Sequence, residues 1–283
     1  MIGWILWGMR SRKGFGEDMI KLAIVGCTGK LGSAIMKNTL NNQAVEVACA
    51  IARKGNQYVG KNISELIGGK SDVVITDDIE DASNCDVYID CTNAETFMSS
   101  SYAKYEKMEK PLIIATTAFT SEDIKKINLL AERVPVFMTG NFSVALHDFI
   151  ETTMFYARKI SQDTDIQIVE YHHNQKKDAP SGTALMIKEA LLKANDTIDG
   201  DRVAISSIRG GNIFGEHEVI FAGEDEVIEF KHTAHSKAVF AKGAVEAGKF
   251  LKGKEPGLYD MKDVLTSKYN YFHNADGDIQ AQK

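Results

Sequence analysis

The side chains best suited to acid–base chemistry lie close together in residues 170–184, with the sequence EYHHNQKKDAPSGTA. Histidine can donate or accept a proton near neutral pH, and lysine can donate a proton or hold an anion. His172 and His173 end a strand-like apolar run, and Lys176 follows in the next loop. Because side chains alternate along a strand, we expect the two imidazoles to point to opposite sides, with one facing a cleft.

The same segment contains the expected start of a helix. Ser181 precedes Gly182 and Thr183, which open a stretch of helical period. The first turn of a helix presents unpaired backbone N–H groups and a positive dipole end, which can receive a carboxylate. Histidine pairs are often structural and Ser-Gly-Thr is often only a cap, but their clustering favours a site. Zinc binding by the two histidines and Asp178 is an alternative without the usual spacing.

A glycine-rich turn follows the first strand of the main pattern. Residues 26–32 read GCTGKLG, directly after the strand expected at 20–26 and at the start of the helix expected at 30–40. Small residues there let a pyrophosphate approach the backbone, and the last glycine lets the helix pack on the strand. Thr28 stands where the commoner G-x-G-x-x-G pattern has its second glycine. The position of the turn in a βαβ unit favours a dinucleotide site over an ordinary tight turn.

The end of the second expected strand bears on the choice between NADPH and NADH. Proteins that use NAD usually place a carboxylate there to bind the ribose hydroxyls. This chain has Ala52, Arg53 and Lys54 instead. We therefore expect no carboxylate that would repel a 2′-phosphate, and arginine can bind one in bidentate fashion. The sequence favours NADPH and leaves NADH possible, with a solvated basic loop as the alternative.

These motifs belong to an alternation of strands and helices that begins at Met19. Apolar runs separated by segments of helical period predict a doubly wound, Rossmann-type α/β domain over residues 19–143, joined by the C-terminal segment 241–283. Residues 144–240 change to a long helix, a strand, the histidine loop, another helix and three strand-like runs. We expect those three runs to pair antiparallel in a second, α+β domain with a mixed sheet, which would bind substrate and form the oligomer.

Composition limits the remaining classes of function. The net charge of −6 argues against sequence-independent nucleic-acid binding, which needs a basic face. The four cysteines form no CxxC pair, and we expect buried thiols in a reducing cytoplasm rather than disulfides or metal ligands. The apolar run at residues 2–9 is too short to span a membrane and lacks the order of a secretory signal. We interpret residues 1–18 as a disordered extension.

The histidine loop also carries a family resemblance. The pattern E-x-H-H-x-x-K-x-D-x-P-S-G-T-A resembles the signature of the dihydrodipicolinate reductases of the diaminopimelate and lysine pathway. Further stretches agree in order, including NFSV at 141–144, GEH at 215–217 and FAKGA at 240–244. The resemblance implies an NAD(P)H-dependent enzyme that reduces 4-hydroxy-tetrahydrodipicolinate, a small dicarboxylate, to tetrahydrodipicolinate with loss of water. It also implies a homotetramer.

The resemblance assigns roles to the matching residues. His172 would exchange the proton, and Lys176 would be the second proton donor. Substrate carboxylates would be held by His173, Gly182 and Thr183. The cofactor-binding residues would be Gly26, Cys27, Thr28, Gly29, Lys30 and Leu31 at the pyrophosphate, Arg53 at the 2′-phosphate, and Ala115, Thr116, Thr117, Thr139, Gly140, Asn141 and Phe142 at the nicotinamide. The cofactor would supply a hydride. The protein would align the reactants, bind the anionic groups and supply the acid. No metal is expected.

A few positions depart from the family's pattern. They are Ala52, Asn93, Ala115, Ala118 and Glu246. Alanine replaces a common glycine at 115 and 118, some members are acidic at 52, and some are basic at 93 and 246. These departures bear on cofactor preference and leave the proton donors in place. Two rival functions stay open, another dicarboxylate or amino-acid dehydrogenase on the same scaffold and a nucleotide-binding regulator. The histidine loop argues against both.

Overall fold

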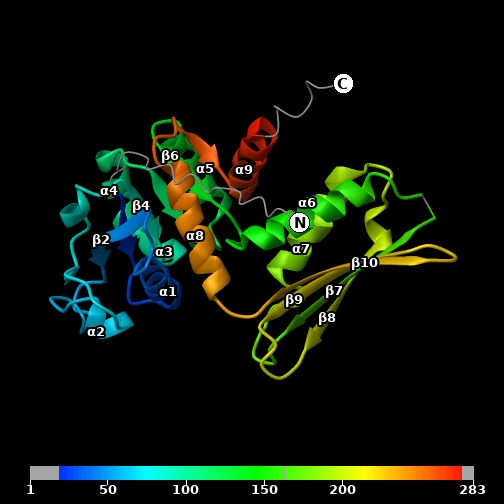
Figure 1. Ribbon diagram of the computed structural model, residues 1–283, viewed down its shortest axis with the longest axis horizontal. Coiled ribbons are helices and arrows are strands. Elements are labelled where there is room, and N and C mark those ends of the chain that lie inside the picture. Colours follow the sequence, from blue (N-terminus) through cyan, green and yellow to red (C-terminus); the bar gives the residue numbers. More distant parts are fainter. Residues whose placement is uncertain (1–18, 162, 276–283) are drawn as a thin grey trace, which may run out of the picture.

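Seven parallel strands of the computed structural model form one sheet, in the order β11-β6-β5-β4-β1-β2-β3 (Figure 1). The structure describes residues 19–161 and 163–275, with side chains as far as residue 268. The strands are β1 (Ile20–Val25), β2 (Val45–Ile51), β3 (Ile75–Thr76), β4 (Val87–Asp90), β5 (Leu112–Ile114), β6 (Pro135–Met138) and β11 (Gly257–Tyr259). The parallel order and apolar strands confirm the expected Rossmann-type sheet. The extension predicted at residues 1–18 lies outside the described residues.

Helices cover both faces of this sheet, which explains why its strands are apolar on both sides. One face packs against α1 (Lys30–Thr39), α2 (Ser64–Ile67), α8 (Ala238–Leu251) and α9 (Met261–Ala275). The other packs against α4 (Tyr102–Met108) and α5 (Ser121–Ala131). The sequence predicts one helix over residues 96–108, but a π-helical turn at Phe97–Ser101 separates α3 (Ala94–Thr96) from α4. The C-terminal segment joins the sheet through both α8 and β11.

A four-stranded mixed sheet forms the other half of the molecule, in the order β10-β9-β7-β8 (Figure 1). Its strands are β7 (Asp165–His172), β8 (Val203–Arg209), β9 (Gly215–Ala222) and β10 (Val227–Ala234). β9 is antiparallel to β7 and β10, but β8 is parallel to β7, so the expectation that all three later strands pair antiparallel was wrong for β8. The helix between β7 and β8 returns the chain to the same end of the sheet, as a parallel pair requires.

Two helices, α6 (Val144–Ala157) and α7 (Gly182–Ala194), cover one face of the second sheet. Their buried side chains pack with alternate residues of the strands, such as Ile166 and Ile168 of β7.

Among the described residues, no helix is long and apolar enough to cross a membrane. Cys27, Cys49 and Cys85 are buried, and Cys91 is partly buried; burial raises the pKa of the Cys49 thiol to about 11. The expected mixed α+β arrangement is confirmed.

The contact between α8 and the loop after β6 depends on a glycine. A Cβ built at Gly243 would lie 1.6 Å from the carbonyl oxygen of Phe142. We expect Gly243→Ala to lower the free energy of unfolding by about 3 kcal/mol, the upper end for overpacking, because the obstructing atom is backbone. Guanidinium unfolding followed by circular dichroism measures this. Gly248→Ala is the control, since its Cβ would first meet the end of the Leu22 side chain, at 3.3 Å. Equal stability of the two variants would contradict the prediction.

Candidate functional site

A large cavity, the turn cavity, lies at the carboxyl ends of β1, β2 and β4 and measures about 500 Å³. Gly26, Thr28 and Gly29 of the glycine turn line it, together with Arg53. This is the edge at which open α/β sheets bind nucleotides. α1 begins at Lys30 without a side-chain cap, so its first backbone N–H groups can receive a pyrophosphate. The cavity therefore fits the dinucleotide that the sequence predicts.

The glycine turn requires residues without a side chain at two positions. Gly26 has a φ of 77°, and a Cβ there would lie 3.0 Å from the backbone carbon of Cys91. A Cβ at Gly32 would lie 2.6 Å from the carbonyl oxygen of Gly26. Only glycines thus let α1 start directly against β1. Cys27, which the resemblance places at the pyrophosphate, is fully buried in the core, and its backbone N–H donates to the carbonyl of Ile51 at 3.0 Å.

The turn cavity holds charges of both signs. Arg53 and Lys54 line it as predicted, and Lys104 of α4 adds a third cation. Asp77 also lines it, whereas the sequence led us to expect no carboxylate there. That expectation considered only the end of β2, whereas Asp77 follows β3, which pairs in parallel with β2 and ends at the same edge. Asn93, one of the departures, lines the cavity while its side chain accepts the N–H of Thr96 at 2.9 Å.

The second cavity, the bridging cavity, measures about 280 Å³ and lies beside the ends of β5 and β6. Its lining residues are Lys30, Leu31, Ala115, Thr117, Thr139, Gly140, Asn141, Phe142, Lys237 and Phe240. Most residues predicted for the nicotinamide are therefore brought together here. Thr116 is the exception, because it is nearly buried and its hydroxyl donates to the carbonyl of Thr92 at 2.8 Å. Ala118 has a φ of 67°, a left-handed conformation that favours the glycine common in the family.

The third cavity, the histidine cavity, measures about 490 Å³ and lies over the end of β7. It is lined by His172, His173, Lys176 and Thr183 among the predicted residues, and Gly182 is not part of the lining. Both of the adjacent histidines line this one cavity, where strand alternation led us to expect one of them to face the cleft. β7 ends at His172, so strand alternation does not extend to the next residue.

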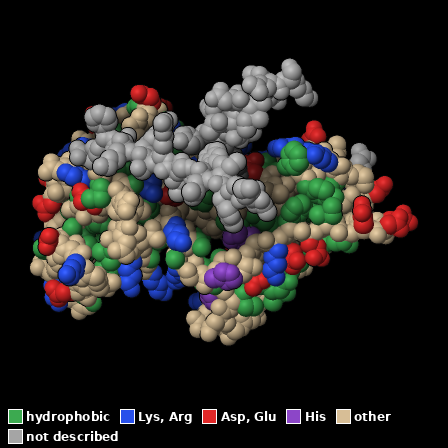
Figure 2. All heavy atoms as spheres, in the orientation of Figure 1, with side chains coloured by type: hydrophobic (Ala, Val, Ile, Leu, Met, Phe, Trp, Pro, Cys, Tyr) green, Lys and Arg blue, Asp and Glu red, His purple; other side chains and the backbone are tan. Residues whose placement is uncertain are grey.

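Sequence reasoning gave no role to two further histidines of this cavity, His217 and His232. Figure 2 shows histidine side chains gathered near the junction of the two halves, with lysine or arginine side chains close by. The Nδ1 atoms of His173, His217 and His232 are buried and lack a hydrogen-bond partner among the described residues. Buried polar atoms are usually paired, so these nitrogens suit a polar ligand. The sequence pattern of β9 could have identified His217, because this residue occupies a position on the buried side of an alternating strand.

A buried ion pair lies behind His172. Glu170 is fully buried, and Arg209 donates to both its oxygens, from Nη1 to Oε2 at 2.9 Å and from Nη2 to Oε1 at 2.6 Å. Glu170 also accepts the backbone N–H of Ser181 at 3.2 Å and is hydrogen-bonded to Nδ1 of His172. Burial opposes its ionisation, but hydrogen bonds, chiefly from Arg209, lower the pKa of Glu170 to about 2. Glu170 is therefore ionised at neutral pH.

The titratable groups of the histidine cavity differ in how they are held. Burial lowers the pKa of His172, although the hydrogen bond to Glu170 opposes this shift. Burial, reinforced by the charge of His172, lowers the pKa of His217 to about 3, so this residue is neutral. The Nζ of Lys176 donates to both carboxylate oxygens of Asp178, at 2.9 and 2.7 Å. Because Asp178 is well exposed, this pair is weak and a substrate carboxylate can replace it.

The start of α7 connects the two halves of the molecule. The amide of Asn141, in the loop after β6, donates to the hydroxyl of Thr183 at 3.2 Å. The hydroxyl of Ser181 caps the helix by accepting the N–H of Ala184 at 3.1 Å. Asn141 also lines both the bridging and the histidine cavities, as do Lys237 and Phe240. The two cavities therefore adjoin, which places the predicted nicotinamide and proton-donor residues on one continuous wall.

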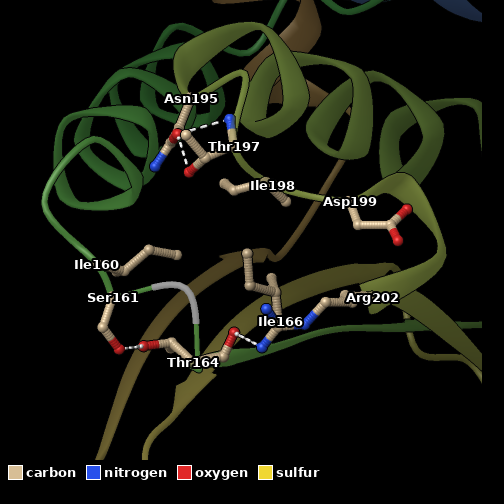
Figure 3. A pocket seen from close by; sticks show the side chains of 9 residues that line it. All are labelled: Ile160, Ser161, Thr164, Ile166, Asn195, Thr197, Ile198, Asp199 and Arg202. Carbon is tan, nitrogen blue, oxygen red and sulfur yellow. Dashed lines mark hydrogen bonds between the residues drawn. The ribbon is translucent and has the colours of Figure 1, made fainter.

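A much smaller hollow lies between the end of α7 and the start of β7 (Figure 3). Its volume of about 10 Å³ is about the space of one water molecule. The Nη2 of Arg202 is used within the fold, donating to the carbonyl of Thr164 at 3.0 Å. This hollow is a packing gap. Among the side chains described within residues 19–161 and 163–268, no group of three or more histidine, cysteine or acidic residues is arranged to hold a metal ion.

Fold and cavities together define a class of protein. The Rossmann-type sheet has a cavity at the carboxyl ends of its strands, and further cavities lead from the sheet to a group of histidines and a lysine. This arrangement is typical of two-domain, nicotinamide-dependent oxidoreductases. The family described as "Dihydrodipicolinate reductase, N-terminus" matches residues 20–142, and "Dihydrodipicolinate reductase, C-terminus" matches residues 144–265. The chain belongs to the dihydrodipicolinate reductase family.

Individual relatives agree with this assignment. The chain is 36% identical to the 4-hydroxy-tetrahydrodipicolinate reductase of Geotalea daltonii, in an alignment that covers 88% of this chain and all of the relative. It is 37% identical to the reductase of the same name from Caldanaerobacter subterraneus subsp. tengcongensis, in an alignment that covers 87% of this chain and 98% of the relative. The dipicolinate-bound dihydrodipicolinate reductase from Paenisporosarcina sp. TG-14 has a similar fold, with a TM-score of 0.71 at 22% identity, covering 86% and 98% of the two chains.

Proposed function

We propose that this protein catalyses the NAD(P)H-dependent reduction of 4-hydroxy-tetrahydrodipicolinate to tetrahydrodipicolinate, with loss of water, in diaminopimelate and lysine biosynthesis. One observation carries the proposal: the bridging and histidine cavities share the wall formed by Asn141, Lys237 and Phe240. A substrate among the histidines would therefore lie next to the residues predicted to hold the nicotinamide. A nucleotide-binding regulator would need no such arrangement of proton donors.

The histidine cavity suits a dicarboxylate that gains a proton. A nicotinamide cofactor, when bound, supplies a hydride to a conjugated cyclic imine. The start of α7 offers Thr183 and free backbone N–H groups to one carboxylate, and His173 lines the same cavity. His172 would give the proton to the carbon next to the one that receives the hydride, with Lys176 as the second donor. The net charge of −6 does not oppose an anionic substrate, because three lysines and only one carboxylate line this cavity.

NADPH is the proposed preferred cofactor, with NADH accepted. Arg53, Lys54 and Lys104 outnumber Asp77 in the turn cavity, which supports a site for the 2′-phosphate. We also propose that residues 19–143 with 241–283 form the dinucleotide-binding domain and residues 144–240 the substrate-binding domain. The hydrophobic clusters agree with this division, since α8 packs on the first sheet while α6 and α7 pack on the second. Four free cysteines suit the cytoplasm as the location.

A homotetramer is the proposed assembly. Helices α6 and α7 cover only one face of the second sheet. By strand alternation, Val169, Ile208 and Ile220 project from the opposite face, where Ile208 is 42% exposed. Apolar side chains exposed on a sheet face suit contact with another copy of the chain. Light scattering after size-exclusion chromatography would distinguish a tetramer from a monomer.

The function is tested by following NADPH oxidation with freshly made 4-hydroxy-tetrahydrodipicolinate. The purified protein should oxidise NADPH only when this substrate is present, and the product should be tetrahydrodipicolinate. Parallel assays with other cyclic imino acids and with 2-oxo dicarboxylates test the rival dehydrogenase function. Absence of oxidation with 4-hydroxy-tetrahydrodipicolinate, or faster turnover of another acid, would overturn the proposal.

Removing the guanidinium of Arg53 should weaken NADPH selectively. Charge-assisted hydrogen bonds contribute about 1.5–3 kcal/mol, so we expect Arg53→Ala to raise the KM for NADPH by roughly 10- to 100-fold. The KM for NADH should change less than about threefold, since NADH has no 2′-phosphate. Steady-state kinetics with both cofactors measure this, with Arg158→Ala as a matched control outside the turn cavity. Equal losses with both cofactors would show that this arginine does not bind the 2′-phosphate.

A further inference from the structure

The tautomer of His172 follows from its partner. Glu170 is ionised, and an ionised carboxylate can only accept hydrogen bonds. The hydrogen between Glu170 and the Nδ1 of His172 therefore belongs to the imidazole. In the neutral ring this leaves Nε2 as the nitrogen with a lone pair, and in the imidazolium Nε2 carries the exchangeable proton.

The Nε2 of His172 lies beside a residue without a side chain. A Cβ built on Gly215, the first residue of β9, would lie 3.3 Å from this Nε2 and 3.6 Å from the neighbouring ring carbon, with no other heavy atom within 4 Å. Gly215 also lines the histidine cavity. Its backbone does not need glycine, since its φ lies outside the left-handed region. The absent side chain thus leaves space at one atom, the Nε2 of His172.

We propose that Glu170 is a positioning residue that presents the Nε2 of His172 to the reacting carbon, and that Gly215 keeps the space this nitrogen needs. This inference rests on the proposed function and names a division of labour within it: Glu170 orients the ring, and Nε2 gives up the proton. Arg209 holds Glu170 in place. Its Nη2 binds both Glu170 and the carbonyl of Asp178, at 2.6 Å each, so the same ion pair holds the loop that carries Lys176.

Among the charged groups around His172, Glu170 is the one that stabilises its protonated form. Arg209 on β8 and Lys176 in the loop are positive and lower the pKa of His172, as does burial, whereas Glu170 raises it. His217 on β9 stands edge-on to the ring, 5.4 Å between centroids, and is neutral. Asp178 is bound to Lys176. Only an imidazolium can give a proton, so losing the charge of Glu170 should lower the pH above which activity is lost.

The first test is the pH profile of kcat for Glu170→Gln, which keeps the size of the side chain and removes its charge. A neighbouring opposite charge shifts a pKa by about 1–3 units, so the limb at which activity falls with rising pH should move to lower pH by at least about one unit. The KM for NADPH should stay within about twofold. Glu218→Gln, on β9 of the same sheet, is the matched control and should keep the wild-type profile. A lower kcat with an unmoved limb would mean a merely structural role and overturn the proposal.

The second test crowds Nε2 directly. Gly215→Ala should lower kcat at least about tenfold with little change in the KM for NADPH, because the new methyl reaches His172 alone, and loss of general acid catalysis is worth about 10²–10⁴-fold. Gly223→Ala, just past the other end of β9, is the control, since its Cβ would meet only the carbonyl oxygen of Glu226, at 3.5 Å. Equal activity of the two variants would overturn the role of Gly215.

A third measurement does not depend on turnover. Nitrogen-15 NMR of histidine-labelled protein, with the His172 signals assigned by comparison with His172→Ala, reports which ring nitrogen carries hydrogen. At a pH where the ring is neutral, we expect hydrogen on Nδ1 of His172 in the wild type. Hydrogen on Nε2 instead would overturn the proposal even if the enzyme is active. Conversely, an Nδ1–H signal in a protein that does not reduce the substrate would support the positioning and refute the proposed function.

Discussion

Replacing His172 with alanine is expected to lower kcat for the reduction of 4-hydroxy-tetrahydrodipicolinate by roughly 10²–10⁴-fold, the usual contribution of a general acid. The KM for NADPH should stay within about twofold, because His172 lines the histidine cavity and not the turn or bridging cavities. The variant should fold, since the imidazole is partly exposed to the cavity. Stopped-flow measurement of NADPH oxidation at saturating substrate separates kcat from binding.

The exposed His235→Ala is the matched control and should leave kcat unchanged. Lys176→Ala should also lose activity, with a larger rise in the KM for the substrate, because this lysine can exchange Asp178 for a substrate carboxylate. If His172→Ala kept wild-type kcat while Lys176→Ala lost it, the lysine would be the acid that protonates the carbon. Wild-type activity in both variants would show that neither group donates the proton.

The fold could be predicted from local pattern because most of its strands are buried on both sides. Apolar runs such as those of β1 and β4 leave few other interpretations, and the glycine turn marks where the first helix begins. β8 was misjudged because strand direction depends on a crossover that local residues do not encode. β11, only three residues long, pairs with β6 from across the chain, and so short a strand gives no period to detect.

The candidate site was predictable where one segment carries it and not where distant segments meet. His172, His173, Lys176 and Thr183 lie within one loop and its flanking ends, and the structure brings all four to one cavity. The contact of Arg209 with Glu170 could not be predicted from the sequence, because it depends on the parallel pairing of β7 and β8. Asp77 was missed for the same reason. Both depend on tertiary contacts between strands, and a single sequence does not encode these locally.

Replacing Arg209 with methionine is expected to lower the free energy of unfolding by about 3–5 kcal/mol at pH 7, because it leaves the carboxylate of Glu170 buried without its cation. The pKa of Glu170, lowered from an ordinary 4.5 to about 2, has the sign that this expectation requires, since the hydrogen bonds from Arg209 are the largest cause that lowers it. Guanidinium unfolding at fixed protein concentration measures the loss. Arg133→Met is the control, since its pair with Glu109 is more than half exposed on both sides and should contribute less than about 1 kcal/mol.

The loss caused by Arg209→Met should depend on pH in a defined direction. A carboxyl whose pKa is lower in the folded chain stabilises the fold above the unfolded pKa, and this stability is lost as the pH falls through the folded pKa. For Glu170 the window runs from about 4.5 down to about 2. At pH 3 a larger fraction of the variant's Glu170 is protonated and needs no cation, so the difference from wild type should fall to less than about half its value at pH 7. An equal difference at both pH values would mean that Arg209 stabilises the loop by packing and by its bond to Asp178, and not by the charge of Glu170.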